Sequence, residues 1–239
     1  MGAFSDVGSS LRIESQVSHY INTGEPMEES NLMEFRLLYD GELAGNSAKA
    51  RDKHAIRKQL HPQLRRLWNT EIRLRQYAAH VGLMSSVSVP ITDKSEEERA
   101  EIGLAAIGKN FSRAGYELVP LVTAELALRC ALDILLLRPS EGKKTIFEGG
   151  DMDNQIKTLF DGLKIPQNAN DLGGNVPGPD ENPFFCLLED DRLISEVRVV
   201  TDQLLVRPHQ VAIRQTDVFA VIYVKLNHNP PRFWDNYFG

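Results

Sequence analysis

The feature that most constrains the fold is a series of short apolar segments in the second half of the chain. In residues 126–139, LALRCALDILLLRP, every second residue from Leu126 to Leu136 is apolar. This alternation is typical of a half-buried strand, although the Ala and Leu content also allows a helix. Residues 154–163, NQIKTLFDGL, have the 3–4 spacing of an amphipathic helix. Further strand candidates are 184–190, 192–200 and 217–226. The sequence therefore predicts a mixed α/β (α+β) fold.

The chain is expected to have three parts. Residues 1–32 are polar and weakly patterned and form an extension of uncertain order. Residues 33–115 combine one strand with basic helices and a connection, and residues 116–239 hold most of the strands. A long loop is expected at 165–183, which is dense in Pro, Gly, Asn and Asp.

Three boundaries in the first half have specific signals. Asn46 or Ser47 can cap a helix that ends near residue 60, and Pro62 is expected to begin a second helix. Ser95, three residues before Glu98, forms a capping-box pattern at the start of a third helix.

Composition indicates a soluble globular protein, with 42% hydrophobic and 25% charged residues. The sequence has no run of 18 apolar residues and no export signal, so we expect a cytoplasmic protein that does not cross a membrane. Cys130 and Cys186 lie in apolar runs and are expected to be small buried hydrophobic residues in a reducing compartment. The histidine spacing excludes the commonest zinc motifs.

Charge is unevenly distributed along the chain. Residues 49–76 hold nine Lys or Arg and two acids, whereas residues 148–202 hold twelve acids and four basic residues. The basic segment can therefore meet a polyanion, and the acidic segment can gather cations. The expected contacts to DNA phosphates are Arg51, Lys53, Arg57, Lys58, Arg65 and Arg66. A solvated helical face is the alternative interpretation of this basic run.

The acidic segment contains a candidate magnesium site. If the chain is extended at Asp151 and Asp153, their carboxylates project to the same side. Magnesium prefers such oxygen ligands and keeps waters that leave room for a phosphate. Asp190 and Asp191, at the end of an apolar segment, can supply a third carboxylate, and Lys157 lies one helical turn after Asp153. Its ammonium could approach a phosphate held by the metal.

Each of these residues also has a simpler interpretation. Asp153 is a suitable helix N-cap, and Lys157 can form an ordinary surface pair with Asp153 or Asp161. Asp190 and Asp191 can belong to a solvated turn. A calcium-binding EF-hand is excluded, because Ile156 occupies the position of the loop glycine.

The segments DMDNQIKTLFDGL, 151–163, and FFCLLEDDRLI, 184–194, together resemble the RusA family of Holliday-junction resolvases. The resemblance covers roughly residues 124–228. It implies a strand at 126–137, a small mixed sheet with packed helices, and a homodimer that cuts branched DNA with Mg²⁺ or Mn²⁺. The metal ligands that it implies are Asp151, Asp153 and Asp191, with Asp190 in support, and the catalytic lysine is Lys157. Asn154 and Asp161 also match and are expected to have orienting or structural roles.

The leading hypothesis is therefore a magnesium-dependent endonuclease in DNA recombination and repair. A second hypothesis is nucleotidyl transfer, which also uses a D-x-D pair and a third carboxylate with magnesium. A third is a non-catalytic scaffold or nucleic-acid-binding protein on the same fold.

Overall fold

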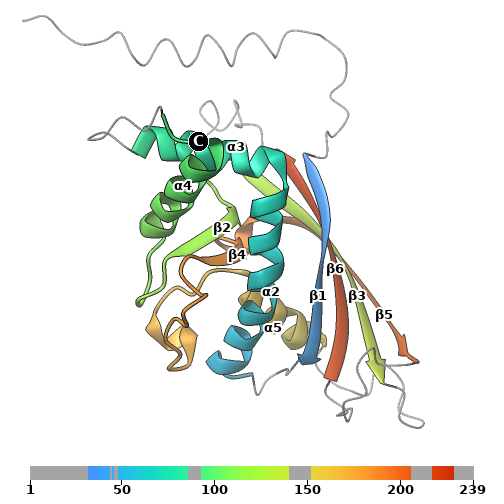
Figure 1. Cartoon of the computed structure of the whole chain (residues 1–239). Helices are drawn as coiled ribbons and strands as arrows, with labels where there is room; N and C mark the ends of the chain where they lie inside the picture. Colours follow the sequence, from blue (N-terminus) through green and yellow to red (C-terminus); the bar gives the residue numbers. More distant parts are fainter. Residues whose placement is uncertain are drawn as a thin grey trace, which may run out of the picture. The chain divides into compact units, whose positions relative to one another are not determined.

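Most of the predicted strands and helices are present in the computed structural model, which describes residues 32–43, 45, 48–85, 93–139, 152–205 and 217–228. All of these belong to one unit, Asn31–Gly239. In chain order, its elements are β1 (Met33–Glu42), α2 (Ala50–Thr70), α3 (Ile72–Ser85), α4 (Glu96–Asn110), β2 (Leu118–Val122), β3 (Leu128–Pro139), α5 (Met152–Leu163), the 3₁₀ helix η2 (Ala169–Leu172), β4 (Phe184–Leu188), the 3₁₀ helix η3 (Asp191–Leu193), β5 (Ile194–Leu204) and β6 (Asp217–His228) (Figure 1). The fold is mixed α+β, as the sequence predicts.

The larger sheet has the strand order β1-β6-β3-β5. Strand β6 is antiparallel to both of its neighbours, and β3 is parallel to β5. Residues 128–139 form a strand, which resolves the ambiguity between helix and strand. Cys130, Leu132, Ile134 and Leu136 alternate along β3 and are at most 2% exposed, so the period-2 pattern marks the buried face.

Helix α2 passes through Pro62, so the prediction of a second helix beginning there is wrong. Ile56 and Leu60 before the proline and Leu64 and Trp68 after it are all at most 2% exposed and belong to the same core. Their spacing of four residues places them on one face of a single helix. Burial along this face offsets the hydrogen bond that proline cannot donate. The predicted caps Asn46 and Ser47 lie outside the described residues.

The helix ends instead at Thr70. The backbone of the next residue, Glu71, is extended (φ −80°, ψ 119°), and α3 follows directly. Helix α4 begins with the predicted capping box, in which Ser95 and Glu98 bond each other's backbone N–H groups. Helices α3 and α4 cross very closely. A Cβ at Gly82 would lie 2.1 Å from the Arg99 carbonyl oxygen, and a Cβ at Gly103 would lie 1.8 Å from that of Ala78.

A second sheet pairs β2 with β4 in parallel, and all residues of both strands are buried. Strand β4 was predicted, whereas β2 was not. The backbone N–H of Ile165, just after α5, donates to the Leu188 carbonyl oxygen at 2.9 Å. This bond places the end of α5 beside the end of β4, where Asp190 and Asp191 follow. The predicted loop at 165–183 contains η2.

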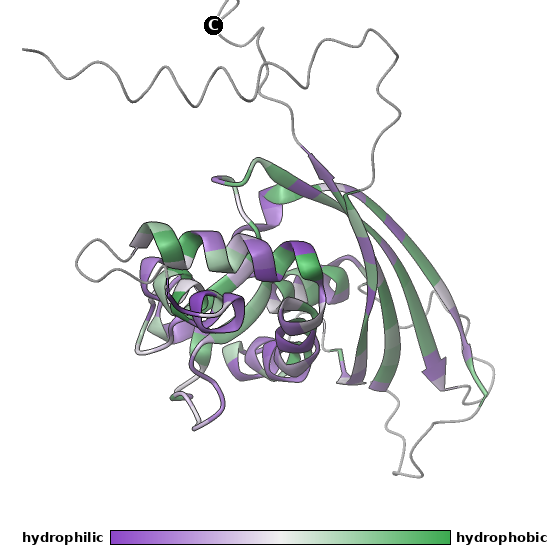
Figure 2. Cartoon of the chain, turned by 45° about the horizontal axis from the view of Figure 1, so that its top comes forward, coloured by the Kyte–Doolittle hydropathy of each residue, from purple (hydrophilic) through white to green (hydrophobic). Residues whose placement is uncertain are grey.

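The described helices lie on one side of the larger sheet (Figures 1 and 2). Strand β1 pairs with β6 along its whole length, so the segments 33–115 and 116–239 share one sheet.

Both cysteines are buried and unpaired, as predicted, and burial raises the pKa of each thiol to about 12. Among the described helices, we find none with the length and apolarity needed to cross a membrane.

Candidate functional site

The first turn of α5 carries part of the predicted magnesium site. Asp151 lies outside the described residues. Asp153 is in the first turn, its side chain is 76% exposed, and one of its carboxylate oxygens accepts a hydrogen bond from the Lys157 ammonium at 2.5 Å. This geometry matches the simpler interpretation of an i,i+4 surface pair, which typically contributes about 0.3–0.5 kcal/mol.

Asp190 is engaged in a local turn. Its carboxylate caps η3 by accepting from the backbone N–H of Arg192 at 2.9 Å. The Arg192 guanidinium donates to both carboxylate oxygens, at 2.8 and 3.2 Å. These side-chain and backbone hydrogen bonds lower the pKa of Asp190 to about 2. Asp190 is therefore a capping residue held by its own neighbour.

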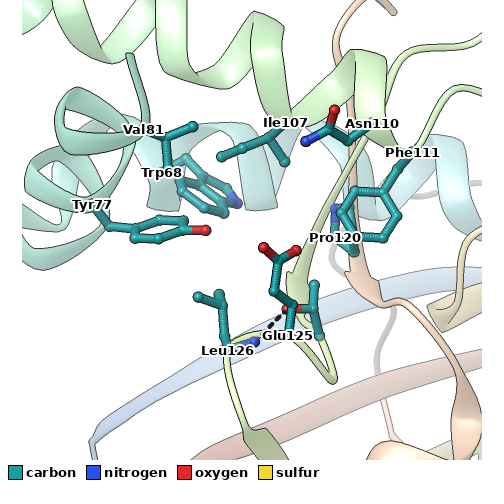
Figure 3. A pocket seen from close by; sticks show the side chains of 10 residues that line it. Trp68, Tyr77, Val81, Ile107, Asn110, Phe111, Pro120, Glu125 and Leu126 are labelled. Carbon is teal, nitrogen blue, oxygen red and sulfur yellow. Dashed lines mark hydrogen bonds between the residues drawn. The ribbon is translucent and has the colours of Figure 1, made fainter. Parts of the chain in front are cut away.

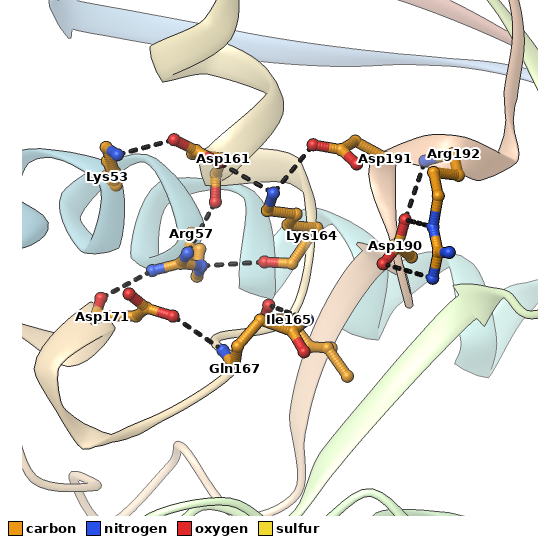
Figure 4. A network of polar contacts seen from close by, with 10 residues as sticks. All are labelled: Lys53, Arg57, Asp161, Lys164, Ile165, Gln167, Asp171, Asp190, Asp191 and Arg192. Atoms are coloured by element: carbon orange, nitrogen blue, oxygen red, sulfur yellow. Dashed lines mark hydrogen bonds and ion pairs between the residues drawn. The ribbon is translucent and has the colours of Figure 1, made fainter.

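Asp191 belongs to a chain of charges that joins three elements (Figure 4). The Lys53 ammonium on α2 lies 2.6 Å from a carboxylate oxygen of Asp161 on α5. The Lys164 ammonium, just after α5, lies 2.9 Å from the other oxygen of Asp161 and 2.8 Å from an oxygen of Asp191. Two carboxylates from different elements thus converge on one ammonium group. We call these four residues the charge network.

The network is partly withdrawn from water, which strengthens its interactions. Burial acts to raise the pKa of Asp161, but hydrogen bonds from Lys53 and Lys164 outweigh it and hold this pKa below its ordinary value. Burial likewise acts to lower the pKa of Lys164, and hydrogen bonds to Asp191 and Asp161 outweigh it and raise this pKa. Asp161 and Lys164 are therefore both charged at neutral pH.

Arg57 supports the network from below. Its guanidinium donates to the carbonyl oxygens of Asp161, Lys164 and Asp171 at 2.6, 2.8 and 3.0 Å. Arg57 is only 3% exposed, and this burial lowers the pKa of its guanidinium. Because the guanidinium is enclosed and bonded to the chain itself, the prediction that Arg57 contacts DNA is wrong. It is a structural residue that binds the carbonyls at the end of α5.

The remaining predicted phosphate contacts lie at or near the surface. Arg51, Arg65 and Arg66 are exposed on α2. Lys58 is half-buried and forms an ion pair with Glu181 at 3.0 Å, as Lys53 does with Asp161. The three exposed arginines are therefore the members of this set that are most open to a ligand.

The structure brings Asp191 to Asp161 and does not bring it to Asp153. An α-helix rises by about 1.5 Å per residue, so Asp153 and Asp161 are about 12 Å apart along α5. Asp191 is bonded through Lys164 to the end that is opposite Asp153. Within the described ranges, no three His, Cys, Asp or Glu side chains are grouped closely enough to hold a metal ion. The oxygen donors suit Mg²⁺ chemically, but the described carboxylates alone do not form a complete site.

Lys164 is the member of this site that sequence reasoning missed. Its position three residues after Asp161 predicts an ordinary i,i+3 pair. Its contact with Asp191 depends on how α5 packs beside β4, and residue spacing does not encode that packing. No model of a known protein family matches this chain, and neither the curated proteins nor the solved structures that were compared with it include a match.

Proposed function

We propose that the protein is a magnesium-dependent endonuclease that hydrolyses phosphodiester bonds in branched DNA. The observation that carries this proposal is the convergence of the Asp161 and Asp191 carboxylates on the Lys164 ammonium. Carboxylates that can hold a metal and a lysine that can approach a phosphate are the groups that metal-assisted hydrolysis requires. The resemblance of residues 151–163 and 184–194 to RusA-type resolvases supports the same chemistry.

In this proposal Asp161 and Asp191 would hold Mg²⁺ or Mn²⁺, and the Lys164 ammonium would bind the phosphate. A bound metal ion would polarise a phosphoryl oxygen and lower the pKa of a bound water. Asp153 and Lys157 lie at the other end of α5, where the sequence predicts the metal site together with Asp151. Mutation of the carboxylates at each end of α5 decides which end binds the metal.

The exposed arginines of α2 supply the DNA contacts in this proposal. Arg51, Arg65 and Arg66 would bind phosphates electrostatically, with Lys53 and Lys58 at the edge of the same helix. Such binding weakens steeply as salt rises, because counterions are released from DNA. By the same resemblance, the protein would act as a cytosolic homodimer in DNA recombination and repair.

The test is cleavage of a synthetic four-way junction beside a linear duplex, in Mg²⁺ and in EDTA. We expect cutting of the junction in Mg²⁺ only. Asp191→Asn and Asp161→Asn should each slow cutting by about 100-fold or more, with junction binding in EDTA retained. Asp202→Asn, an exposed carboxylate outside the charge network, is the matched control and should cut normally.

Asp153→Asn identifies the centre that is used. A loss of cutting in this variant, with normal cutting by Asp191→Asn, would move the metal site to the first turn of α5. Absence of magnesium-dependent cutting by the wild-type protein would refute the nuclease.

A non-catalytic nucleic-acid-binding or scaffold protein is the second candidate. The observation that favours it is that Asp153, Asp161, Asp190 and Asp191 are all engaged by lysine or arginine side chains. Isothermal titration with Mg²⁺ or Mn²⁺ separates the two candidates. Heat of binding that disappears in Asp191→Asn supports the enzyme, whereas an absence of binding supports the scaffold.

A further inference from the structure

A cavity of about 70 Å³ opens to the surface beside α3 and α4, and none of its lining residues belongs to the charge network (Figure 3). Its buried lining includes Trp68 of α2 and Ile107 of α4, which are 2% and 7% exposed. Tyr77 and Phe111 line its sides, and Glu125, in the turn after β2, lies at its mouth. The volume accommodates about five water molecules, or an ammonium group on a short carbon chain.

The walls are aromatic. The ring centroids of Trp68 and Tyr77 lie 6.3 Å apart, with an angle of 41° between the ring planes. Figure 3 shows the Phe111 ring on the other side of the opening. The faces of aromatic rings carry partial negative charge and attract cations within about 6 Å of the ring centroid. Three aromatic rings border this space (Figure 3), and a cation held there would be attracted wherever it lies over a ring face.

Glu125 adds a full negative charge at the mouth. Its carboxylate points into the space between Trp68 and Phe111 (Figure 3). Among the residues drawn in Figure 3, none forms a hydrogen bond with this carboxylate. Burial, followed by the charge of Glu125, raises the pKa of Tyr77. None of the described residues that line the cavity is Lys or Arg, so their net charge is negative.

The Trp68 indole gives an independent indication of a ligand. Its Nε1–H group is buried and has no hydrogen-bond partner among the described residues. Figure 3 shows this nitrogen facing the space next to Asn110 and Glu125. An indole N–H can only donate, and a buried donor without an acceptor is costly. A ligand that places an oxygen acceptor in the cavity would remove this cost.

We propose that the cavity binds an organic amine whose ammonium group sits among the three rings and pairs with Glu125, and whose neighbouring carbonyl oxygen accepts from Trp68 Nε1–H. An α-amino group next to a carbonyl has this arrangement, as in an amino-acid amide or the N-terminus of a peptide. The apolar side chain of such a ligand would contact Ile107. This site is independent of the proposed nuclease, because it needs neither a metal nor DNA.

The test uses Trp68 as its own reporter. The chain has two tryptophans, so a Trp234→Phe background leaves Trp68 as the single emitter. Leucinamide is titrated against this protein, followed by N-acetyl-leucinamide, which has no charge, and isoamylamine, which has no carbonyl. We expect a saturable change in emission with leucinamide and affinities that are about tenfold or more weaker for the other two compounds.

Matched variants locate the site. Glu125→Gln keeps the shape and removes the charge, and should weaken leucinamide binding about tenfold or more. Glu101→Gln removes an exposed charge of α4 outside the cavity and should bind normally. Equal binding of the acetylated compound, undiminished binding by Glu125→Gln, or no saturation up to about 10 mM leucinamide would each overturn the proposal.

The source of the amine is distinguished by a further pair of ligands. The tripeptide Leu-Gly-Gly is compared with its N-acetylated form. Binding of the free tripeptide at least as tightly as leucinamide identifies a peptide N-terminus as the ligand. Binding of leucinamide without binding of the tripeptide identifies a small amine as the ligand, because the cavity then has no room for a chain that continues beyond the carbonyl.

Discussion

Arg57 determines how the acidic end of α5 is held. Its guanidinium bonds the carbonyl oxygens of Asp161 and Lys164, at the end of α5, and that of Asp171 in η2. The last carbonyls of a helix have no partner within the helix, so they need donors from elsewhere. Arg57 supplies these donors from α2 and so fixes the backbone of Asp161 and Lys164.

Arg57→Met keeps a long apolar side chain and removes all of these donors. A hydrogen bond from a charged donor contributes about 1.5–3 kcal/mol, and a buried carbonyl left without a donor costs about 1–3 kcal/mol. Three such bonds would total more than about 4 kcal/mol, but the burial of a charged guanidinium opposes folding. We therefore expect the free energy of unfolding to fall by about 3–5 kcal/mol.

The assay is urea unfolding followed by far-UV circular dichroism. Arg66→Met, at an exposed position of the same helix, is the control and should change stability by about 0.5 kcal/mol or less. Arg57→Lys retains the charge but not the fork of donors, and should lie between the two. A loss of less than about 1 kcal/mol in Arg57→Met would show that these carbonyls do not depend on the guanidinium.

Two further predictions concern the helices. Gly103→Ala would place a Cβ 1.8 Å from the Ala78 carbonyl oxygen, so α3 and α4 must separate. We expect the free energy of unfolding in urea to fall by about 1–3 kcal/mol or more. In the control Gly178→Ala, the nearest neighbour of the new Cβ would be 3.5 Å away, so this change should be nearly neutral. Burial lowers the pKa of His54 from 6.5 to about 4, so the unfolded chain takes up a proton before the folded chain does, and stability should fall by about 3 kcal/mol between pH 6.5 and pH 4. Urea unfolding at several pH values should show that the free energy of unfolding depends less steeply on pH in His54→Asn than in the wild-type protein. An unchanged pH dependence would contradict this assignment.

Local pattern was sufficient for the elements whose burial alternates along the chain. Strand β3 shows a buried residue at every second position, and α5 buries Leu159 and Leu163 at helical spacing. Strand β2 is buried on both faces, so it has no alternation to detect. Pro62 predicted a helix start because proline suits the first turn of a helix. The shared burial of residues on both sides of Pro62 instead keeps one helix continuous.

The candidate site was only partly accessible from sequence for a similar reason. The i,i+4 pair of Asp153 and Lys157 follows from local spacing and is present, and the predicted turn at Asp190 and Asp191 is the 3₁₀ helix η3. The contact between Lys164 and Asp191 spans 27 residues and depends on the long loop that returns the chain to β4. Residue spacing does not show where such a loop brings the chain back, so the partner of Asp191 could not be deduced.

The charge balance of the charge network determines whether a metal ion can bind between its carboxylates. Lys53 and Lys164 carry two positive charges, and Asp161 and Asp191 carry two negative charges, so the four residues are neutral together. A divalent cation added between the carboxylates would leave an excess of two positive charges in a partly buried place, which is unfavourable unless an ammonium leaves. Lys164 is the group between the carboxylates, so it is the one that must move. Metal binding and the Lys164 pairing are therefore alternatives, and a nuclease that used Asp161 and Asp191 would need this side chain to exchange between them, whereas a scaffold would not.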